Sequence, residues 1–546
     1  MSPNQKSNPF LARISGAAAL ATLFAFYMVM RPQALHVSDA YAWVNTVATE
    51  SFDYYFHPHH LIYLTVAWRW SQFVHLVAPS ASVWASLAAL SAVFGCAGVA
   101  ATYATLRLVG SARGAAAVGS MLPAFAFGYW FFSSDADMPV ISLACVLWAG
   151  YFLAKFVTTG EDRCAFWAGV ATGLAALFHQ TGILFSLGAM VVCLVRWRKT
   201  GPAAALLFSS AFIMLVAPWY IIAAWAVLPV FGVGEFIRWL FLFAGEGYGG
   251  FSLAGTTRAP FGLARALFGG QMALDVLRGA SAGGAMVWIG LAFAAAGLAA
   301  LSAFGVAAIR RLRELPKAGL VVVAGLMCAF GTYAAFGTYF DPANFEWWTI
   351  PSTLLFAAAA VAGLSGRRPA TAIALTAIVC MASSNFILEF SYRRQPHCDF
   401  LQDAASDVEA ITTDRDIVIA PSYLGVLIWH DAPERRVFCP DKMQRLVDER
   451  SMKATLEQMA REGRGGARFV IAGADYDSET RQFVDRILAA VPASEQKTLT
   501  TIRFFDGGRR FIRTVSQVPV IAVDEAPFVA ALRSAEVAPA GRAGSP

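Results

Sequence analysis

The chain has 546 residues, of which 57% are hydrophobic and only 14% are charged, and its formal net charge is +6. Soluble domains carry about 25% charged residues, so this composition excludes an ordinary soluble protein and indicates one that crosses a membrane many times. Residues 1–390 are mostly apolar runs of membrane length, whereas residues 397–531 have ordinary soluble composition. Residues 532–546, rich in Ala, Gly, Ser and Pro, are expected to form a disordered tail.

Apolar segments near the bilayer-spanning length of about 20 residues predict eleven transmembrane helices. One helix over 164–197 would be roughly 50 Å long, too long for the bilayer core, so we expect two short helices that return to the same side. The segment His179-Gln180-Thr181-Gly182 separates them. The predicted spans are residues 14–31, 82–106, 114–132, 138–157, 164–178, 182–197, 203–228, 284–309, 318–338, 350–365 and 370–389.

The charges of the connecting loops predict the orientation. Cytoplasmic loops carry an excess of Lys and Arg. With the N-terminus inside, basic residues gather in the cytoplasmic loops, whereas acidic residues lie mostly in the outer ones. An odd number of spans then places residues 397–546 outside.

Two outer segments are longer than the others, residues 31–80 and 229–283. In the first, residues 61–78 predict an amphipathic helix that lies along the membrane interface. The second is Gly-rich and predicts short amphipathic helices over 236–243 and 263–277.

The C-terminal region predicts a small α/β domain, because strand and helix patterns alternate along it. Strands are expected at 416–420, 436–439, 468–472 and within 498–514, with helices near 441–461 and 478–490. Cys398 and Cys439 are candidates for a disulfide if this region is extracytoplasmic.

The unusual polar residues of the membrane region all fall on the outer face in this topology. Ionisable residues at membrane depth are expensive and mark functional sites by default. Four convergent loops therefore predict a site at this face. Its candidate residues are Asp39; His57, His59 and His60; Asp135 and Asp137; His179 and Gln180; and Asn344 and Glu346.

Several of these residues have a structural alternative. Asp39 follows Ser38 at the start of an apolar stretch, where it would cap a helix. Asp135 and Asp137 are similar to the Asp-x-Asp pairs that hold divalent metals in sugar-nucleotide enzymes, but capping of the next span explains them equally well. His179 and Gln180 would satisfy open helix ends.

The histidine cluster has three interpretations. Three histidines within four residues cannot all ligate one metal easily, so contact with a phosphate or a sugar is favoured over metal ligation, and the third alternative is satisfied surface histidines. Trp347 and Trp348, which follow Asn344, fit an aromatic interface belt as well as a sugar-stacking platform.

The pattern resembles the GT-C superfamily of integral-membrane glycosyltransferases, which includes protein O-mannosyltransferases and aminoarabinose transferases of lipid A. In that superfamily an essential acid follows the first span, and Asp39 occupies this position. His57-Pro58 resembles the His-Pro of one branch, although His59-His60 stand where Pro-Gly is usual. A second acid shortly after the first is also missing.

The resemblance implies sugar transfer from a polyprenyl-phosphate donor to a protein, lipid or polysaccharide at the outer face of the bacterial inner membrane, with Asp39 as general base. Arg258 and Arg265, with the histidines, are candidates to stabilise the leaving phosphate. No nucleotide-binding motif is found, no nucleic acid is expected as a partner, and no cofactor other than a possible divalent metal is indicated. The competing hypothesis is a transporter or flippase of lipid-linked sugars.

Overall fold

The computed structural model describes residues 9–31, 38–49, 57–228, 232–241, 253–277, 284–364, 368–392, 400–421, 424–425, 427–428, 432, 435–439, 449–462, 468–472, 478–505 and 515–534. The chain divides into two compact units. The first comprises Met1–Leu35, Trp43–Gly270 and Ala285–Ser391, and the second His36–Ala42, Gln271–Gly284 and Tyr392–Pro546.

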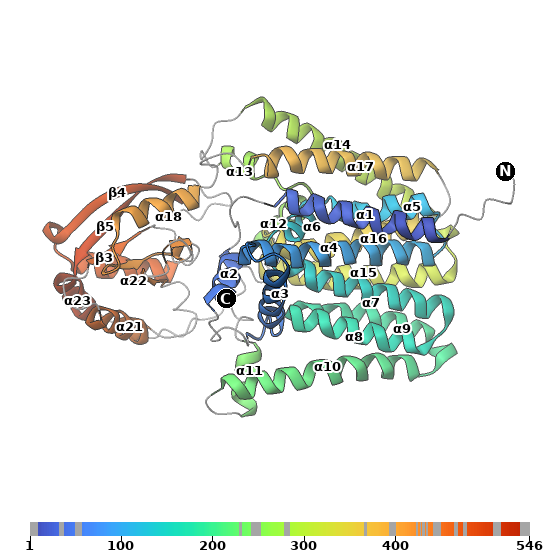
Figure 1. The fold of residues 1–546 in the computed structure, drawn as a ribbon, viewed down its shortest axis with the longest axis horizontal. Helices are drawn as coiled ribbons and strands as arrows, with labels where there is room; N and C mark the ends of the chain where they lie inside the picture. The colour runs from blue at the N-terminus through green and yellow to red at the C-terminus, as the bar shows by residue number, and fades with distance from the viewer. Residues whose placement is uncertain are drawn as a thin grey trace. The chain divides into compact units, whose positions relative to one another are not determined.

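The first unit is a bundle of long helices that run side by side (Figure 1). They are α1 (Pro9–Val29), α4 (Val83–Leu108), α5 (Arg113–Ala124), α6 (Phe127–Ser134), α7 (Pro139–Thr159), α8 (Asp162–Phe178), α9 (Phe185–Thr200), α10 (Ala203–Val227), α14 (Ala285–Arg311), α15 (Lys317–Phe340), α16 (Glu346–Gly363) and α17 (Arg368–Asn385). Among the described residues, six helices are long and apolar enough to cross a membrane, or seven if α5 and α6 form one broken span. The chain is a multi-pass membrane protein.

Each of the eleven segments predicted to span the membrane is helical, although the number of spans stays a prediction. The expected single helix over 114–132 is wrong, because α5 and α6 meet at a bend of 76°. Pro123 lies in the last turn of α5 and removes a backbone donor there. The expected break near His179 is confirmed: a short 3₁₀ turn (Gln180–Leu184) separates α8 from α9.

Small residues let the bundle helices pack closely, as in other membrane helix pairs. A Cβ added at Gly169 of α8 would lie 2.3 Å from the Phe208 carbonyl oxygen of α10. Only glycine fits at this contact, so the backbones of α8 and α10 pack directly against each other.

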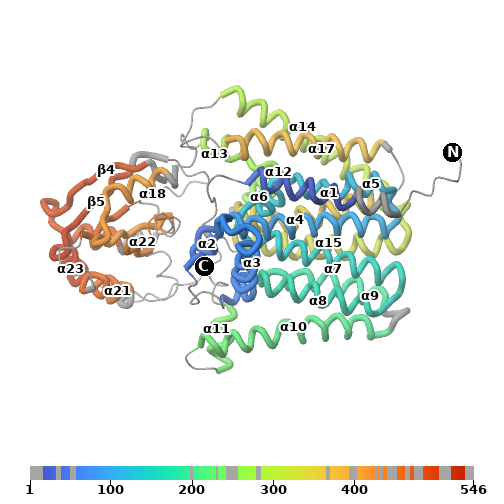
Figure 2. Tube along the Cα trace, viewed as in Figure 1, coloured from blue at the N-terminus to red at the C-terminus, as the bar shows by residue number. Residues whose placement is uncertain are grey.

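Short helices lie at one end of the bundle. They are α3 (Tyr63–Val77), α11 (Val233–Leu240) and α12 (Leu253–Phe268). Helix α2 (Ser38–Thr49) is divided between the two units, and α13 (Gln271–Leu277) belongs to the second unit. The amphipathic helix expected over 61–78 is α3, which runs across the ends of the bundle helices (Figures 1 and 2). The helix predicted over 236–243 begins and ends a few residues earlier, as α11, and the prediction over 263–277 is split between α12 and α13.

The second unit contains a five-stranded sheet in the order β2-β1-β3-β5-β4. The strands β1 (Ile417–Ile419), β2 (Arg436–Phe438) and β3 (Arg468–Ile471) are parallel, whereas β5 (Val515–Asp524) runs antiparallel to β3 and to β4 (Gln496–Phe505). In register, Val418 pairs with Val437 and Val470.

Helices pack on this sheet and complete its hydrophobic core, in which the rings of Phe469 and Phe528 stack at 3.8 Å. They are α18 (Phe400–Ile411), α21 (Glu449–Glu462), α22 (Ser478–Ala490) and α23 (Glu525–Ser534). Helix α23 extends three residues into the segment expected to be a tail, and residues 535–546 lie outside the described part of the chain. Cys398 also lies outside it, so the disulfide with Cys439 stays a prediction.

Candidate functional site

The histidine loop, residues 57–60, forms a tight turn just before α3. The backbone N–H of His60 donates to the His57 carbonyl (3.0 Å), and the N–H of His59 donates to His57 Nδ1 (3.3 Å). The hydroxyl of Tyr220 on α10 donates to the Pro58 carbonyl (2.8 Å). The loop is therefore fixed both by its own turn and by the bundle.

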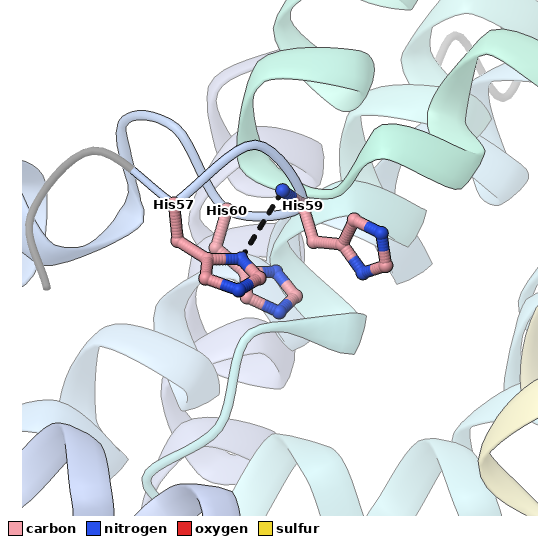
Figure 3. A group of neighbouring side chains, drawn as sticks. All are labelled: His57, His59 and His60. Carbon is pink, nitrogen blue, oxygen red and sulfur yellow. Dashed lines mark hydrogen bonds between the residues drawn. The ribbon is translucent and has the colours of Figure 1, made fainter. Parts of the chain in front are cut away.

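The three imidazole rings of this loop lie close together (Figure 3). The His57 and His60 rings stack at 5.5 Å, whereas the His59 ring stands at right angles to both and points to the other side. One nitrogen from each ring lies within 4.8 Å of the others. Nitrogens that share a zinc ion at 2.0–2.1 Å are only about 3.4 Å apart, so this spacing is loose for a metal site.

The hydrogen bond at His57 also bears on metal binding. A ring nitrogen that accepts a backbone N–H is unprotonated, so the proton of neutral His57 lies on Nε2. That nitrogen is then a donor and not a ligand. The histidine loop is better suited to hydrogen bonding than to metal ligation.

A second loop, between α8 and α9, packs directly on the first. The Gln180 N–H donates to the His59 carbonyl (2.9 Å), and the Ile62 N–H donates to the Leu177 carbonyl (3.2 Å). The His179 ring lies 5.0 Å from the His60 ring. The structure thus brings together the predicted residues of both loops.

Both His179 and Gln180 also have local structural roles. His179 caps the 3₁₀ turn by accepting the Thr181 N–H at Nδ1 (3.2 Å), and the Gln180 amide donates to the Leu240 carbonyl of α11 (3.1 Å). These bonds support the alternative in which His179 and Gln180 satisfy open helix ends. They are compatible with a role in binding as well.

Burial keeps these histidines neutral. It lowers the pKa of His59 to about 4, and it lowers that of His179, with smaller contributions from His59 and His57, to about 3. The pKa of His60 is well below its usual 6.5, mainly through burial and then through His179. These three imidazoles can donate hydrogen bonds at neutral pH, but they supply no positive charge.

The Asp135–Asp137 turn joins α6 to α7 and is fully buried, with Asp135 0% and Asp137 1% exposed. Each carboxylate accepts the next residue's backbone N–H at 2.8 Å. The expected cap of the next span is not formed, because the N-cap residue of α7 is Met138, with no side-chain cap hydrogen bond. The Tyr63 hydroxyl at the start of α3 donates to the Ala136 carbonyl (3.5 Å). Burial, and after it the charges of Asp137 and Asp135, raise the pKa of the Tyr63 hydroxyl well above 10. The turn therefore lies next to Tyr63, which follows the histidine loop.

The loop of residues 341–345 joins α15 to α16 and completes the cluster. Its neighbour Trp347 on α16 packs against His179, with ring centroids 5.7 Å apart. Asn344 Oδ1 accepts the Glu346 N–H (3.1 Å), so this side-chain oxygen serves the turn that starts the helix. Glu346 lies in the first turn of α16 and is half-buried.

Helix α12 packs beside this loop. A Cβ at Gly262 would lie 2.3 Å from the Pro342 carbonyl oxygen, and the Arg265 guanidinium lies over the Phe345 ring at 5.1 Å. Arg265 is therefore next to the cluster. Arg258 is exposed and lies two turns earlier on the same side of α12.

Asp39 lies in the first turn of α2 and is exposed, which agrees with the helix-start alternative. It belongs to the second unit, and its role as a base stays a prediction. Sequence reasoning missed Trp43, whose ring lies 5.3 Å from His60, and Tyr63. Both occur one helical turn after a residue that was singled out, Asp39 and His59, and that spacing is the signal that could have found them.

No known protein-family model matches the chain, and no curated protein is similar to it in sequence. Solved structures similar to it include apo ArnT from Cupriavidus metallidurans, with 12% identity, a TM-score of 0.40, and coverage of 95% of this chain and 99% of that chain. ArnT bound to undecaprenyl phosphate matches with 13% identity, a TM-score of 0.39 and coverage of 95% and 98%. The arabinofuranosyltransferase AftD from Mycobacteria (mutant R1389S) matches with 12% identity, a TM-score of 0.41 and coverage of 93% and 41%.

At these identities and TM-scores the likeness does not define the chemistry of this chain.

Proposed function

We propose that this protein transfers a hexose or pentose from a polyprenyl-phosphate donor to a protein, lipid or polysaccharide acceptor at the outer face of the bacterial inner membrane. The observation that carries the proposal is the convergence of the histidine loop, the His179 turn and the Asp135–Asp137 turn at one end of a membrane bundle. Buried polar groups gathered in this way are expensive and mark a site.

The charges at the other end of the bundle support this orientation. The connections from α4 to α5, from α7 to α8 and from α14 to α15 are rich in basic residues, as cytoplasmic loops are. These residues are Arg107, Arg113, Lys155, Arg163, Arg310, Arg311, Arg313 and Lys317. We infer that this end is cytoplasmic and that the polar cluster and the sheet domain are periplasmic.

In the proposed reaction an acceptor hydroxyl attacks the anomeric carbon, and the bond from that carbon to the phosphate oxygen breaks. Asp39 takes the hydroxyl proton, and polyprenyl phosphate leaves with the bonding electrons. Arg258 and Arg265 would stabilise the phosphate charge, because the buried histidines are neutral.

The remaining candidates are proposed to orient hydroxyl groups of the donor or the acceptor. They are His57, His59, His60, Asp135, Asp137, His179, Gln180, Asn344 and Glu346. Carboxylates and neutral imidazoles accept and donate the hydrogen bonds that sugars need, and the two buried aspartates are the strongest acceptors among them.

The test begins with a deletion strain, in which mass spectrometry of outer glycans, lipids and proteins identifies the missing sugar. Complementation with Asp39→Asn is expected to lower product formation at least 100-fold, the lower end of the range for loss of a general base. Asp162→Asn is the matched control, because Asp162 also lies in the first turn of a helix, α8, but at the opposite end. Wild-type product from Asp39→Asn at normal expression would refute the assignment of the base.

A flippase is distinguished by the fate of the donor. In proteoliposomes supplied with labelled polyprenyl-phosphate sugar and an envelope extract, a transferase releases bare polyprenyl phosphate. A flippase moves the donor across the bilayer and leaves its sugar–phosphate bond intact.

A further inference from the structure

Two neighbouring buried ring nitrogens have no hydrogen-bond partner in the described part of the chain: Trp43 Nε1 and His60 Nδ1. Trp43 is 8% exposed and His60 is 7% exposed. Their rings meet edge to face, with centroids 5.3 Å apart and an interplanar angle of 77°. Since more than about 90% of buried polar groups find a partner, an adjacent pair without one indicates a bound group between them.

The two nitrogens differ in hydrogen-bonding character. An indole Nε1–H can only donate. The Nδ1 atom of a neutral imidazole donates or accepts, according to which ring nitrogen carries the proton.

A group that satisfies both nitrogens must accept from Trp43, and it must either donate to His60 or accept from it. A hydroxyl does this for either tautomer of His60, whereas an ionised phosphate oxygen can only accept. A metal ion cannot bind the indole N–H. The rings of His57, His59 and His179 pack on His60, and that of Tyr63 packs on Trp43. Burial keeps His59 and His179 neutral.

The surroundings also fit a sugar. Aromatic residues continue from His179 to Trp347 and on to Phe340, whose ring lies 4.8 Å from that of Trp347. Aromatic walls with a few placed polar atoms are typical of small-molecule sites. Burying a phosphate charge among neutral groups, by contrast, would be costly.

We propose that Trp43 and His60 bind a hydroxyl of the donor's sugar, in an uncharged subsite that is separate from the α12 arginines assigned to the phosphate. This inference rests on the proposed function and specifies which part of the donor the histidine loop recognises. It adds Trp43 as a binding residue.

The experiment uses the full chain in nanodiscs and measures the affinity for undecaprenyl phosphate and for undecaprenyl phosphate that carries a hexose or a pentose. Wild-type protein is expected to bind one glycosylated form more tightly than the bare lipid. Trp43→Phe keeps the ring and removes the N–H. It is expected to weaken binding of that glycosylated form about tenfold, the effect of one hydrogen bond, and to change binding of the bare lipid less than twofold.

Trp130→Phe is the matched control. Trp130 Nε1 is likewise buried and without a partner among the described residues, but its ring packs among Phe26, Phe125 and Phe390 and no polar group of the cluster. This substitution should change neither affinity. If Trp43→Phe does not fold, His60→Phe, which keeps the stacked ring, replaces it with the same expectation.

Each other outcome overturns the inference. An equal loss for both ligands assigns the pair to the phosphate, and no loss for either assigns the space to a buried water. If wild-type protein binds bare undecaprenyl phosphate but no glycosylated form more tightly, the sugar subsite fails while the proposed function stands. If it binds none of these lipids, the proposed function itself fails.

Discussion

The buried histidines should make the stability of this protein strongly dependent on pH, and His179 isolates the effect. Burial favours its neutral form, with a pKa near 3 in the fold against 6.5 for an exposed histidine. The unfolded chain therefore binds a proton that the folded chain refuses. The contribution of neutral His179 to the free energy of unfolding is complete above pH 6.5 and is lost as the pH falls below that value.

The magnitude follows from this difference. Between pH 7 and pH 5 the unfolded state gains about 0.7 of a proton at residue 179, and the folded state gains almost none. The linkage relation gives a loss of about 2 kcal/mol. This value is nearly the same for any folded pKa below about 4.5, so it does not depend on the depth of the shift. In His179→Asn the side-chain oxygen still accepts the Thr181 N–H, but nothing titrates.

The assay is chemical denaturation of wild type and His179→Asn in detergent micelles at both pH values. The variant should lose about 2 kcal/mol less than wild type on acidification. Trp347→Phe is the control, because it alters the ring that packs on His179 and removes no titratable group, so it should follow wild type. Parallel losses in wild type and His179→Asn would show that His179 is not held neutral by burial.

Three further substitutions test how the cluster and the sheet domain are held. Tyr220→Phe removes the hydrogen bond to the Pro58 carbonyl and should lower the unfolding free energy by about 1–2 kcal/mol. Gly262→Ala places a Cβ 2.3 Å from the backbone of the 341–345 loop and should cost about 1–3 kcal/mol, measured in the same denaturation assay, with loss of transfer activity. Asp416→Asn breaks the ion pair between the buried Asp416 and Arg468 (2.7 Å). It should lower the unfolding free energy of the sheet domain by about 2 kcal/mol, measured as a lower melting temperature.

Hydropathy predicted the helices well, because the bilayer requires apolar runs of a fixed length. The same reasoning did not predict the bend at Phe125, since the segment 114–132 is apolar throughout and hydropathy is blind to local backbone geometry. Pro123 was the available signal. Short continuous apolar runs predicted β1 and β3 in the sheet domain, whereas the boundaries of β4 and β5 depend on their pairing with each other.

The candidate site was predicted in its loops but not in its contacts. Sidedness alone indicated that His60, Asp137 and His179 belong to one end of the bundle. The sequence could not reveal that the His59 ring stands at right angles to the other two rings. Nor could it reveal that the side-chain oxygen of Asn344 accepts a hydrogen bond within its own turn. Such details depend on tertiary packing and not on residue type.

The neutrality of the histidines changes how the proposed chemistry must be divided. A departing phosphate needs positive charge or strong donors, and His59 and His179, with pKa values near 4 and 3, provide no charge at physiological pH. Cationic stabilisation then has to come from arginines, of which Arg265 lies beside the cluster on α12. The buried ring nitrogens of Trp43 and His60 are left for the part of the donor that carries hydroxyls. In this proposal, recognition of the sugar and stabilisation of the leaving group fall to different elements of the chain.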